Sequence, residues 1–146
     1  MKHLIAVLLL AGCAAVPDLT KLPLRNPTAP VASQTDATLA RLDGEWRVVQ
    51  AAGIAPGARL RFGVDQAVLA GQAVSLSDQG RGRLLLGGNP VWIYWIDADN
   101  RTAAMGDPDG QRVWIMDRTG RPGERLRIAR EILQWYGYDV TRLEAT

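Results

Sequence analysis

Residues 91–118 read VWIYWIDADNRTAAMGDPDGQRVWIMDR, and this stretch decides the fold. Three short apolar runs, at 91–96, 102–105 and 113–116, alternate with two turns rich in Asp, Asn, Pro and Gly. Such residues favour tight turns, either through hydrogen bonds from their side chains to the local backbone or because they tolerate left-handed conformations. Short strands joined by such turns predict an antiparallel β-sandwich or β-barrel.

More strands are expected before this stretch. Segments with strand character occur at 42–50, 59–64, 72–76 and 82–86. In the second of them, strict alternation places Leu60, Phe62 and Val64 on the buried face, since successive side chains of a strand point to opposite faces. The chain is therefore expected to be mainly β.

A helical pattern follows Gly123. Its apolar stripe is Leu126, Ala129, Leu133 and Tyr136, with polar residues on the other side. Because the run 91–96 is apolar on both faces, we expect one face to line the interior and the other to receive this helix.

The N-terminus has the features of a secretory signal. A cationic start at Lys2 precedes an apolar run at 4–11, which is too short for a membrane span of about 20 residues. Residues 1–12 are therefore predicted to be a signal peptide that ends directly before Cys13, the only cysteine.

The next segment, 13–38, is predicted to be a flexible tether. It contains Pro17, Pro23, Pro27 and Pro30 among small polar residues, and such segments stay extended. The alternative is an ordered arm that lies on the domain. The folded domain is expected to occupy 39–146.

Composition narrows the function. The chain has one histidine, His3, so a chain that begins at Cys13 contains no histidine and no second cysteine. This excludes Ser-His-Asp and Cys-His catalysis and the usual zinc sites, and we predict no enzymatic activity. Basic and acidic residues number 17 and 15, which gives no electrostatic basis for nucleic-acid binding.

The acidic residues of the two turns are interpreted as turn formers. The run that begins at Asp97 starts like a calcium loop but has Thr102 where Gly is needed and Pro108 where Glu is needed. We therefore predict no metal site and no cofactor.

Several motifs resemble the lipocalin family, in its bacterial outer-membrane lipoprotein branch. Gly44-Glu45-Trp46 matches the family's Gly-x-Trp, and 113–119 resembles its final strand, which ends in an arginine. Residues 94–103 resemble its penultimate turn, with Asn100 in place of the usual Tyr, and 137–143 match the branch's C-terminal pattern. The resemblance implies an up-and-down β-barrel with one helix packed outside, shortened between 53 and 88.

The same resemblance assigns roles to individual residues. It makes Gly44, Trp46 and Arg118 structural, with Trp46 closing the bottom of the barrel and Arg118 packing across it. Leu10-Ala11-Gly12-Cys13 resembles a lipobox, which implies lipidation of Cys13, and Ala14 favours the outer membrane, with the domain facing the periplasm. The alternative is a soluble periplasmic protein.

A rival resemblance is to small lipoprotein domains that open with Gly-x-Trp and continue to a Phe-containing strand. Those domains have no C-terminal amphipathic helix of this kind, so the C-terminal third favours the lipocalin family.

Four aromatic residues are the predicted ligand contacts: Trp92, Tyr94, Trp95 and Trp114. Alternation puts Trp92 and Tyr94 on one face and Trp95 on the other. The resemblance implies a small hydrophobic ligand of the fatty acid or lysophospholipid class in a hollow barrel. The alternative is a structural or interaction lipoprotein whose barrel is solid. Monomer and dimer both stay open.

Overall fold

The computed structural model describes residues 22–146, so the predicted signal peptide and Cys13 lie outside the described residues. The elements are α1 (Leu39–Leu42), β1 (Gly44–Ala52), β2 (Arg59–Phe62), β3 (Gln66–Leu69), β4 (Gln72–Gly80), β5 (Arg83–Leu86), β6 (Asn89–Ile96), β7 (Thr102–Gly106), β8 (Val113–Asp117), α2 (Glu124–Trp135), the 3₁₀ helix η2 (Val140–Arg142) and β9 (Glu144–Ala145).

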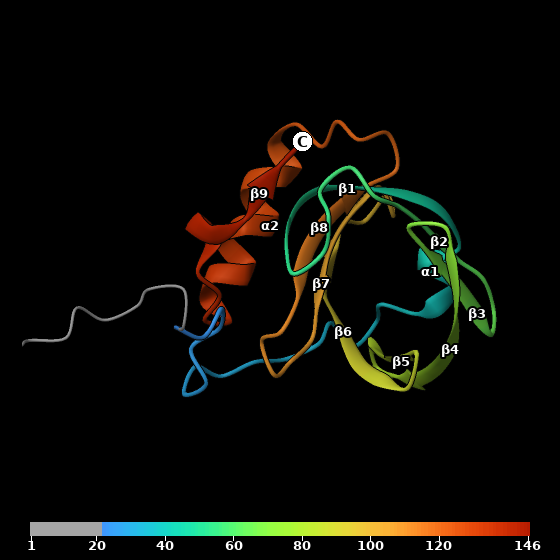
Figure 1. The fold of residues 1–146 in the computed structure, drawn as a ribbon, viewed down its shortest axis with the longest axis horizontal. Helices are drawn as coiled ribbons and strands as arrows, with labels where there is room; N and C mark the ends of the chain where they lie inside the picture. The colour runs from blue at the N-terminus through green and yellow to red at the C-terminus, as the bar shows by residue number, and fades with distance from the viewer. Residues whose placement is uncertain (1–21) are drawn as a thin grey trace, which may run out of the picture.

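The sheet closes into an eight-stranded antiparallel barrel. Consecutive strands pair from β2 to β8, β8 pairs with β1, and β1 pairs with β2 through a register that includes Trp46 opposite Leu60 (Figure 1). The short β9 pairs with Gln50 and Ala51, near the end of β1. This confirms the predicted lipocalin-like barrel with a C-terminal helix.

The barrel interior is packed with large side chains. Trp46, Phe62, Met105, Trp114 and Met116 are all at most 2% exposed and belong to one apolar cluster. Narrow barrels are filled by side chains in this way. Full burial of one such side chain contributes roughly 1.5–3 kcal/mol, and this core stabilises the fold without a disulfide among the described residues.

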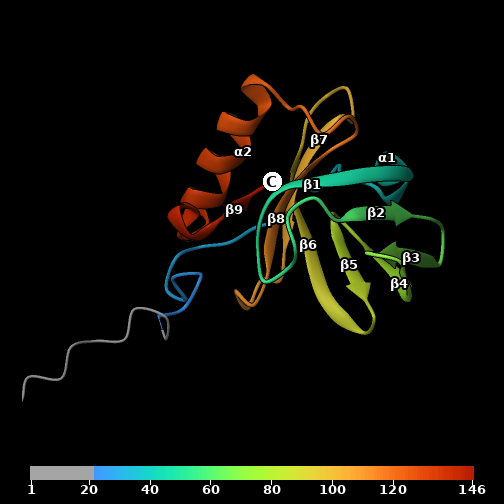
Figure 2. The ribbon, with the colours of Figure 1, turned by 45° about the horizontal axis from the view of Figure 1, so that its top comes forward.

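Helix α2 lies against the outside of β6, β7 and β8 (Figures 1 and 2). Ala129 and Leu133, from the predicted apolar stripe, are fully buried there beside Ile115 of β8. The chain leaves the helix at Gly137, whose φ of 88° favours glycine and whose position beside Ala29 leaves no room for a Cβ. The predicted packing of helix on strand is confirmed.

Two expectations about strand faces are wrong. Val64 is 86% exposed, because β2 ends at Phe62 and Val64 lies in the turn to β3. In β6, the register with β7 shifts between Ile93 and Trp95. This β-bulge inserts an extra residue, so Tyr94 and Trp95 both face outward toward α2 rather than alternating.

The tether prediction is also wrong for residues 22–38, which form an ordered arm. Gln34 donates its backbone N–H to Ile93 and accepts the N–H of Ile96 with its side-chain oxygen, both at 2.8 Å. Leu24 and Ala37 are buried. These contacts satisfy polar groups at the end of β6, which explains why a proline-rich segment is ordered. Within the described residues, no helix has both the length and the apolar character needed to span a membrane.

Candidate ligand-binding site at the barrel mouth

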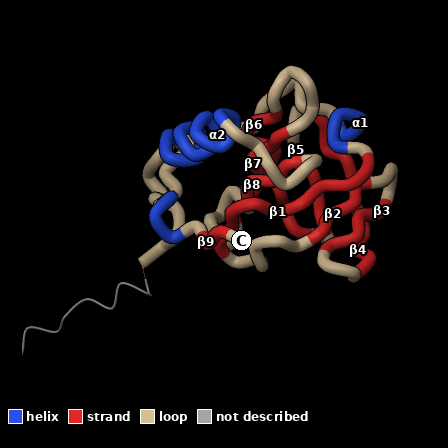
Figure 3. Tube along the Cα trace, turned by 90° about the horizontal axis from the view of Figure 1, so that it is seen from above, coloured by secondary structure: helices blue, strands red, loops and turns tan. Residues whose placement is uncertain are grey.

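The barrel has two different ends, seen from above in Figure 3. The closed end lies beside α1 and the arm, where β1 begins and β8 ends. The mouth is the opposite end, which carries the turns β1–β2, β3–β4, β5–β6 and β7–β8.

The closed end brings together Gly44, Trp46 and Arg118. The Arg118 guanidinium carbon lies 3.8 Å from the centroid of the Trp46 ring. Arg118 also donates to the backbone oxygens of Arg41, Asp43 and Asn100 at 2.6–3.0 Å. Gly44 has φ +94°, and a Cβ there would lie 3.2 Å from the guanidinium. Desolvation lowers the pKa of Arg118 below its ordinary value, although Asp43 opposes the shift.

The four predicted ligand contacts are divided between two sides of the sheet. Trp114 belongs to the interior cluster, whereas Trp92, Tyr94 and Trp95 belong to the cluster between the sheet and α2. The bulge in β6 is the physical reason, because it turns both Tyr94 and Trp95 outward.

Tyr94 takes part in a buried hydrogen-bond chain. Its hydroxyl lies 2.5 Å from that of Tyr138, which donates to the backbone oxygen of Asp107 at 2.7 Å. Burial, together with the neighbouring tyrosine, raises the pKa of Tyr94, and burial raises the pKa of Tyr138 to about 12. Both hydroxyls are therefore neutral at physiological pH, and they tie the segment after α2 to β6 and to the turn after β7.

Trp92 is also engaged on the outside, where the Arg83 guanidinium lies 4.2 Å from its ring centroid. Of the four predicted contacts, Trp114 is therefore the one that the structure places inside the barrel.

The mouth is lined by half-buried apolar side chains that pack on the interior cluster: Ile54, Ala58, Leu69 and Val74. The β3–β4 and β5–β6 turns have two residues each, and a Cβ at Gly71 or Gly88 would meet nothing within 4 Å. The mouth is therefore covered by a thin layer of small and branched side chains. In contrast, the closed end is sealed by several hydrogen bonds.

Trp114 lies one residue from the mouth end of β8 and pairs with Met105 and Ala51 in the barrel wall. Its indole Nε1 is buried and has no hydrogen-bond partner among the described residues. A buried donor without a partner costs about 1–3 kcal/mol, so this N–H is able to bind an acceptor that enters the barrel.

The mouth also carries one ion pair. Arg112 donates to Asp107 at 2.8 and 3.1 Å, which raises the pKa of Arg112 above its ordinary value. The Arg112 guanidinium carbon lies 5.9 Å from the Trp114 ring centroid. A few polar groups beside an apolar surface are typical of small-molecule sites.

The turn aspartates act as the sequence predicted. Asp97 accepts the backbone N–H groups of Arg101 and Thr102 at 2.6 and 2.8 Å. Desolvation alone would raise the pKa of Asp97, but these hydrogen bonds and Arg125 lower it. Across residues 22–146, no group of three metal-ligating side chains is found.

Sequence reasoning missed most of the mouth. Leu69 lies in the four-residue β3 and Val74 in the nine-residue β4, and nothing in either sequence indicates which end of a barrel they occupy. Arg112 follows a turn motif, DPDG, and its closeness to Trp114 on β8 was the available signal.

The comparisons with known proteins define the class of fold as lipocalin-like. A family model described as a lipocalin-like domain matches residues 85–146. Among solved structures, insecticyanin from the tobacco hornworm Manduca sexta is similar with a TM-score of 0.61. That match covers 80% of this chain and 84% of the insecticyanin chain, at 11% sequence identity, and so concerns the fold. No match was found among the curated proteins.

Proposed function

We propose that this protein binds a small hydrophobic ligand that carries a hydrogen-bond acceptor, of the fatty acid or lysophospholipid class, through the mouth of its barrel. The observation that carries the proposal is the buried, unpartnered indole N–H of Trp114 in an otherwise apolar interior. Lipocalin-like proteins are usually binding proteins rather than enzymes, which agrees with this role.

Binding requires the mouth to open. Because the interior is packed, an acyl chain enters by displacing Leu69, Val74 and Ile54, which are half-buried. The apolar chain is desolvated against the interior cluster, at about 0.8 kcal/mol per buried CH₂. The ligand's acceptor oxygen pairs with Trp114, with the Arg112 guanidinium close to the same ring.

Isothermal titration with dodecanoate and with lysophosphatidylcholine tests this function. Trp114→Phe keeps the aromatic ring and removes the donor, so we expect affinity to fall about tenfold. Val74→Trp should block the mouth, whereas Ala73→Trp, at the neighbouring exposed position of β4, is the matched control. Equal affinities in all four proteins, or no binding to the native protein, would overturn the proposal.

We also propose that lipid on Cys13 anchors the domain to the bacterial outer membrane, facing the periplasm. The support is the lipobox-like sequence and Ala14. More than one acyl chain is needed for stable attachment, as expected for a lipidated cysteine with an acylated amino terminus. Cell fractionation of Cys13→Ser tests the anchor, and a variant that still sediments with membranes would contradict it.

A second candidate is an interaction protein with a solid barrel. It is favoured by the full burial of Trp46, Phe62, Met105 and Met116, which fill the interior. Native mass spectrometry of protein purified from its own membrane separates the two candidates. Co-purified lipid supports the ligand-binding function, and ligand-free protein that also fails the titration supports the second.

A further inference from the structure

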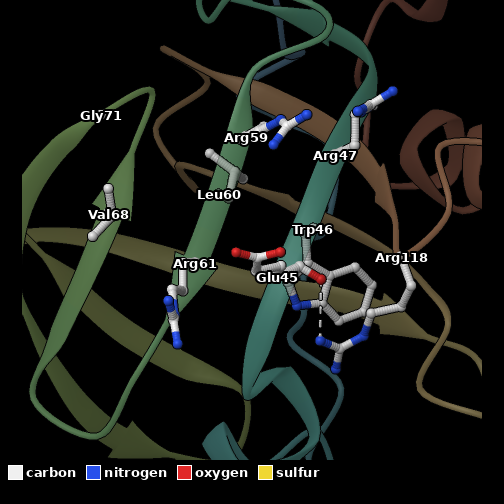
Figure 4. A pocket seen from close by; sticks show the side chains of 9 residues that line it. All are labelled: Glu45, Trp46, Arg47, Arg59, Leu60, Arg61, Val68, Gly71 and Arg118. Atoms are coloured by element: carbon white, nitrogen blue, oxygen red, sulfur yellow. Dashed lines mark hydrogen bonds between the residues drawn. The ribbon is translucent and has the colours of Figure 1, made fainter.

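The outer surface of β1 and β2 carries a cluster of arginines, which we call the arginine pocket. It contains Arg47 and Glu45 on β1 and Arg59 and Arg61 on β2, with Arg118 at its edge (Figure 4). In the ladder, Arg47 lies directly opposite Arg59 and Glu45 opposite Arg61. Like charges directly opposite each other destabilise a sheet, so the Arg47–Arg59 pair needs another explanation.

Three arginines of the pocket have no ion-pair partner in the described part of the chain. Arg47, Arg59 and Arg61 are exposed and form no ion pair or side-chain hydrogen bond with any described residue. Asp117 lies opposite Arg47 on the other neighbouring strand, but its oxygens accept from Thr102 and Thr119 at 2.7–2.8 Å. Three exposed guanidinium groups therefore line a pocket whose lining includes one carboxylate, that of Glu45, which pairs with none of them.

The cluster surrounds a depression with room for a ligand. The pocket has a volume of about 550 Å³, and Val68 and Gly71 contribute to its apolar part. Small-molecule sites range over about 300–1,000 Å³, so a ligand larger than a single ion fits.

We propose that the arginine pocket binds a phosphate-bearing ligand. A guanidinium presents parallel N–H donors that match phosphate oxygens in pairs, and two adjacent guanidinium groups neutralise the nearly two negative charges of a phosphate monoester. Arg47 and Arg59 provide that pair of neighbours. Arg61 lies on the same outward face of β2 as Arg59 and opposite Glu45. Because Glu45 repels anions, the phosphate is expected nearer to Arg47 and Arg59 than to Arg61.

The pocket faces outward on β1 and β2 and touches the proposed mouth at Gly71, in the β3–β4 turn. It lies on the outer wall at β1 and β2, whereas α2 and the start of the described chain lie on the other side of the barrel (Figures 1 and 2). The proposal therefore does not depend on the binding of a hydrophobic ligand or on lipidation of Cys13.

The test uses inorganic pyrophosphate as the probe and follows the arginine Nε–Hε signals by NMR. We expect the signals of Arg47 and Arg59 to shift, and Arg47→Gln or Arg59→Gln to weaken binding about tenfold. Arg81→Gln removes the same charge at the exposed β4–β5 turn and should leave affinity unchanged.

Glu45→Gln should tighten binding, because it removes the one carboxylate. Acetate, which carries a single charge, should bind at least about tenfold more weakly.

A second arm identifies the source of the phosphate. Sedimentation with phosphatidylglycerol vesicles is compared with phosphatidylcholine vesicles and with free pyrophosphate. Binding that depends on Arg59 and occurs only with vesicles identifies a lipid headgroup, and binding only in solution identifies a soluble phosphate. The proposal is overturned if millimolar pyrophosphate and both vesicles fail to bind, or if Arg81→Gln weakens binding as much as Arg59→Gln does.

Discussion

The guanidinium of Arg118 covers the indole of Trp46 at 3.8 Å and so connects the chain after the last barrel strand to the first strand. The indole in turn donates to the backbone oxygen of Leu42 at 2.7 Å. One side chain thus holds together β1, α1 and the β6–β7 turn, because Arg118 also reaches the backbone oxygens of Arg41 and Asn100.

Arg118→Lys should destabilise the protein by about 2 kcal/mol. A lysine keeps the charge but cannot supply the planar fork that reaches three carbonyl oxygens while it stacks on Trp46. Chemical denaturation measures the change, with Arg121→Lys, at an exposed position, as the control within about 0.5 kcal/mol. A stability loss equal to the control would show that the closed end does not depend on Arg118.

The tyrosine pair predicts an unequal effect of two matched variants. Tyr138→Phe removes the bond to Asp107 and leaves the buried Tyr94 hydroxyl without a partner, so it should cost about 1–3 kcal/mol. Tyr94→Phe leaves the Tyr138–Asp107 bond in place and should cost less. Thermal unfolding of both variants checks the order, and the reverse order would contradict the hydrogen-bond chain.

The same pair predicts alkaline sensitivity. The pKa of Tyr138 rises from 10.0 to about 12 in the folded state and that of Tyr94 rises further. Because the two pKa values are higher in the folded state than in the unfolded state, the neutral tyrosines contribute their full stabilisation of the fold below pH 10. This contribution is lost as the pH rises above 10. Denaturant titrations between neutral pH and pH 11 should show this loss, and the double variant with Phe at both positions should show a flatter profile.

Asp117 predicts how the stability of the fold decreases at low pH. Burial alone would raise the pKa of this carboxyl, but hydrogen bonds from Thr102 and Thr119 lower it below 3.8. A lowered folded-state pKa contributes stability above pH 3.8, which is lost as the pH falls through the folded-state value. Asp117→Asn should be less stable at pH 7, because an amide N–H2 cannot accept these donors, and its stability should fall less between pH 4 and pH 2. An equal loss of stability between pH 4 and pH 2 in the native protein and the variant would contradict this role of Asp117.

The ordered arm predicts a local role for Gln34. Gln34→Ala leaves the N–H of Ile96 without its acceptor and should cost about 1–2 kcal/mol. Hydrogen exchange at Ile96 reports the loss directly. Gln79→Ala, whose side chain bonds to Ser77 on the exposed surface, serves as the control, and equal exchange at Ile96 in both variants would contradict the arm's contribution.

The sequence predicted the elements that local patterns determine. The two hairpin turns around β7 and the apolar stripe of α2 were predictable, because turn chemistry and helical periodicity are local. The bulge in β6 was not, since it is a shift in the register between β6 and β7 and leaves no mark in the local pattern of β6. Strand β3 was missed, because four residues with weak alternation carry little signal.

The candidate site was predicted only in part for the same reason. Trp114 was identified from its apolar strand, but its missing hydrogen-bond partner depends on how the closed barrel packs. The order of the arm could not be predicted from its proline-rich composition. It depends on hydrogen bonds between Gln34 and the backbone groups of Ile93 and Ile96, which are far from Gln34 in the sequence.

The central claim is tested most directly by the indole Nε1–H resonances of protein labelled with ¹⁵N-tryptophan, during titration with dodecanoate. We predict a downfield shift of the Trp114 signal as its donor acquires an acceptor, while the exposed Trp135 signal stays in place. A Trp114 signal that does not move at millimolar dodecanoate would contradict the binding of ligands in the barrel.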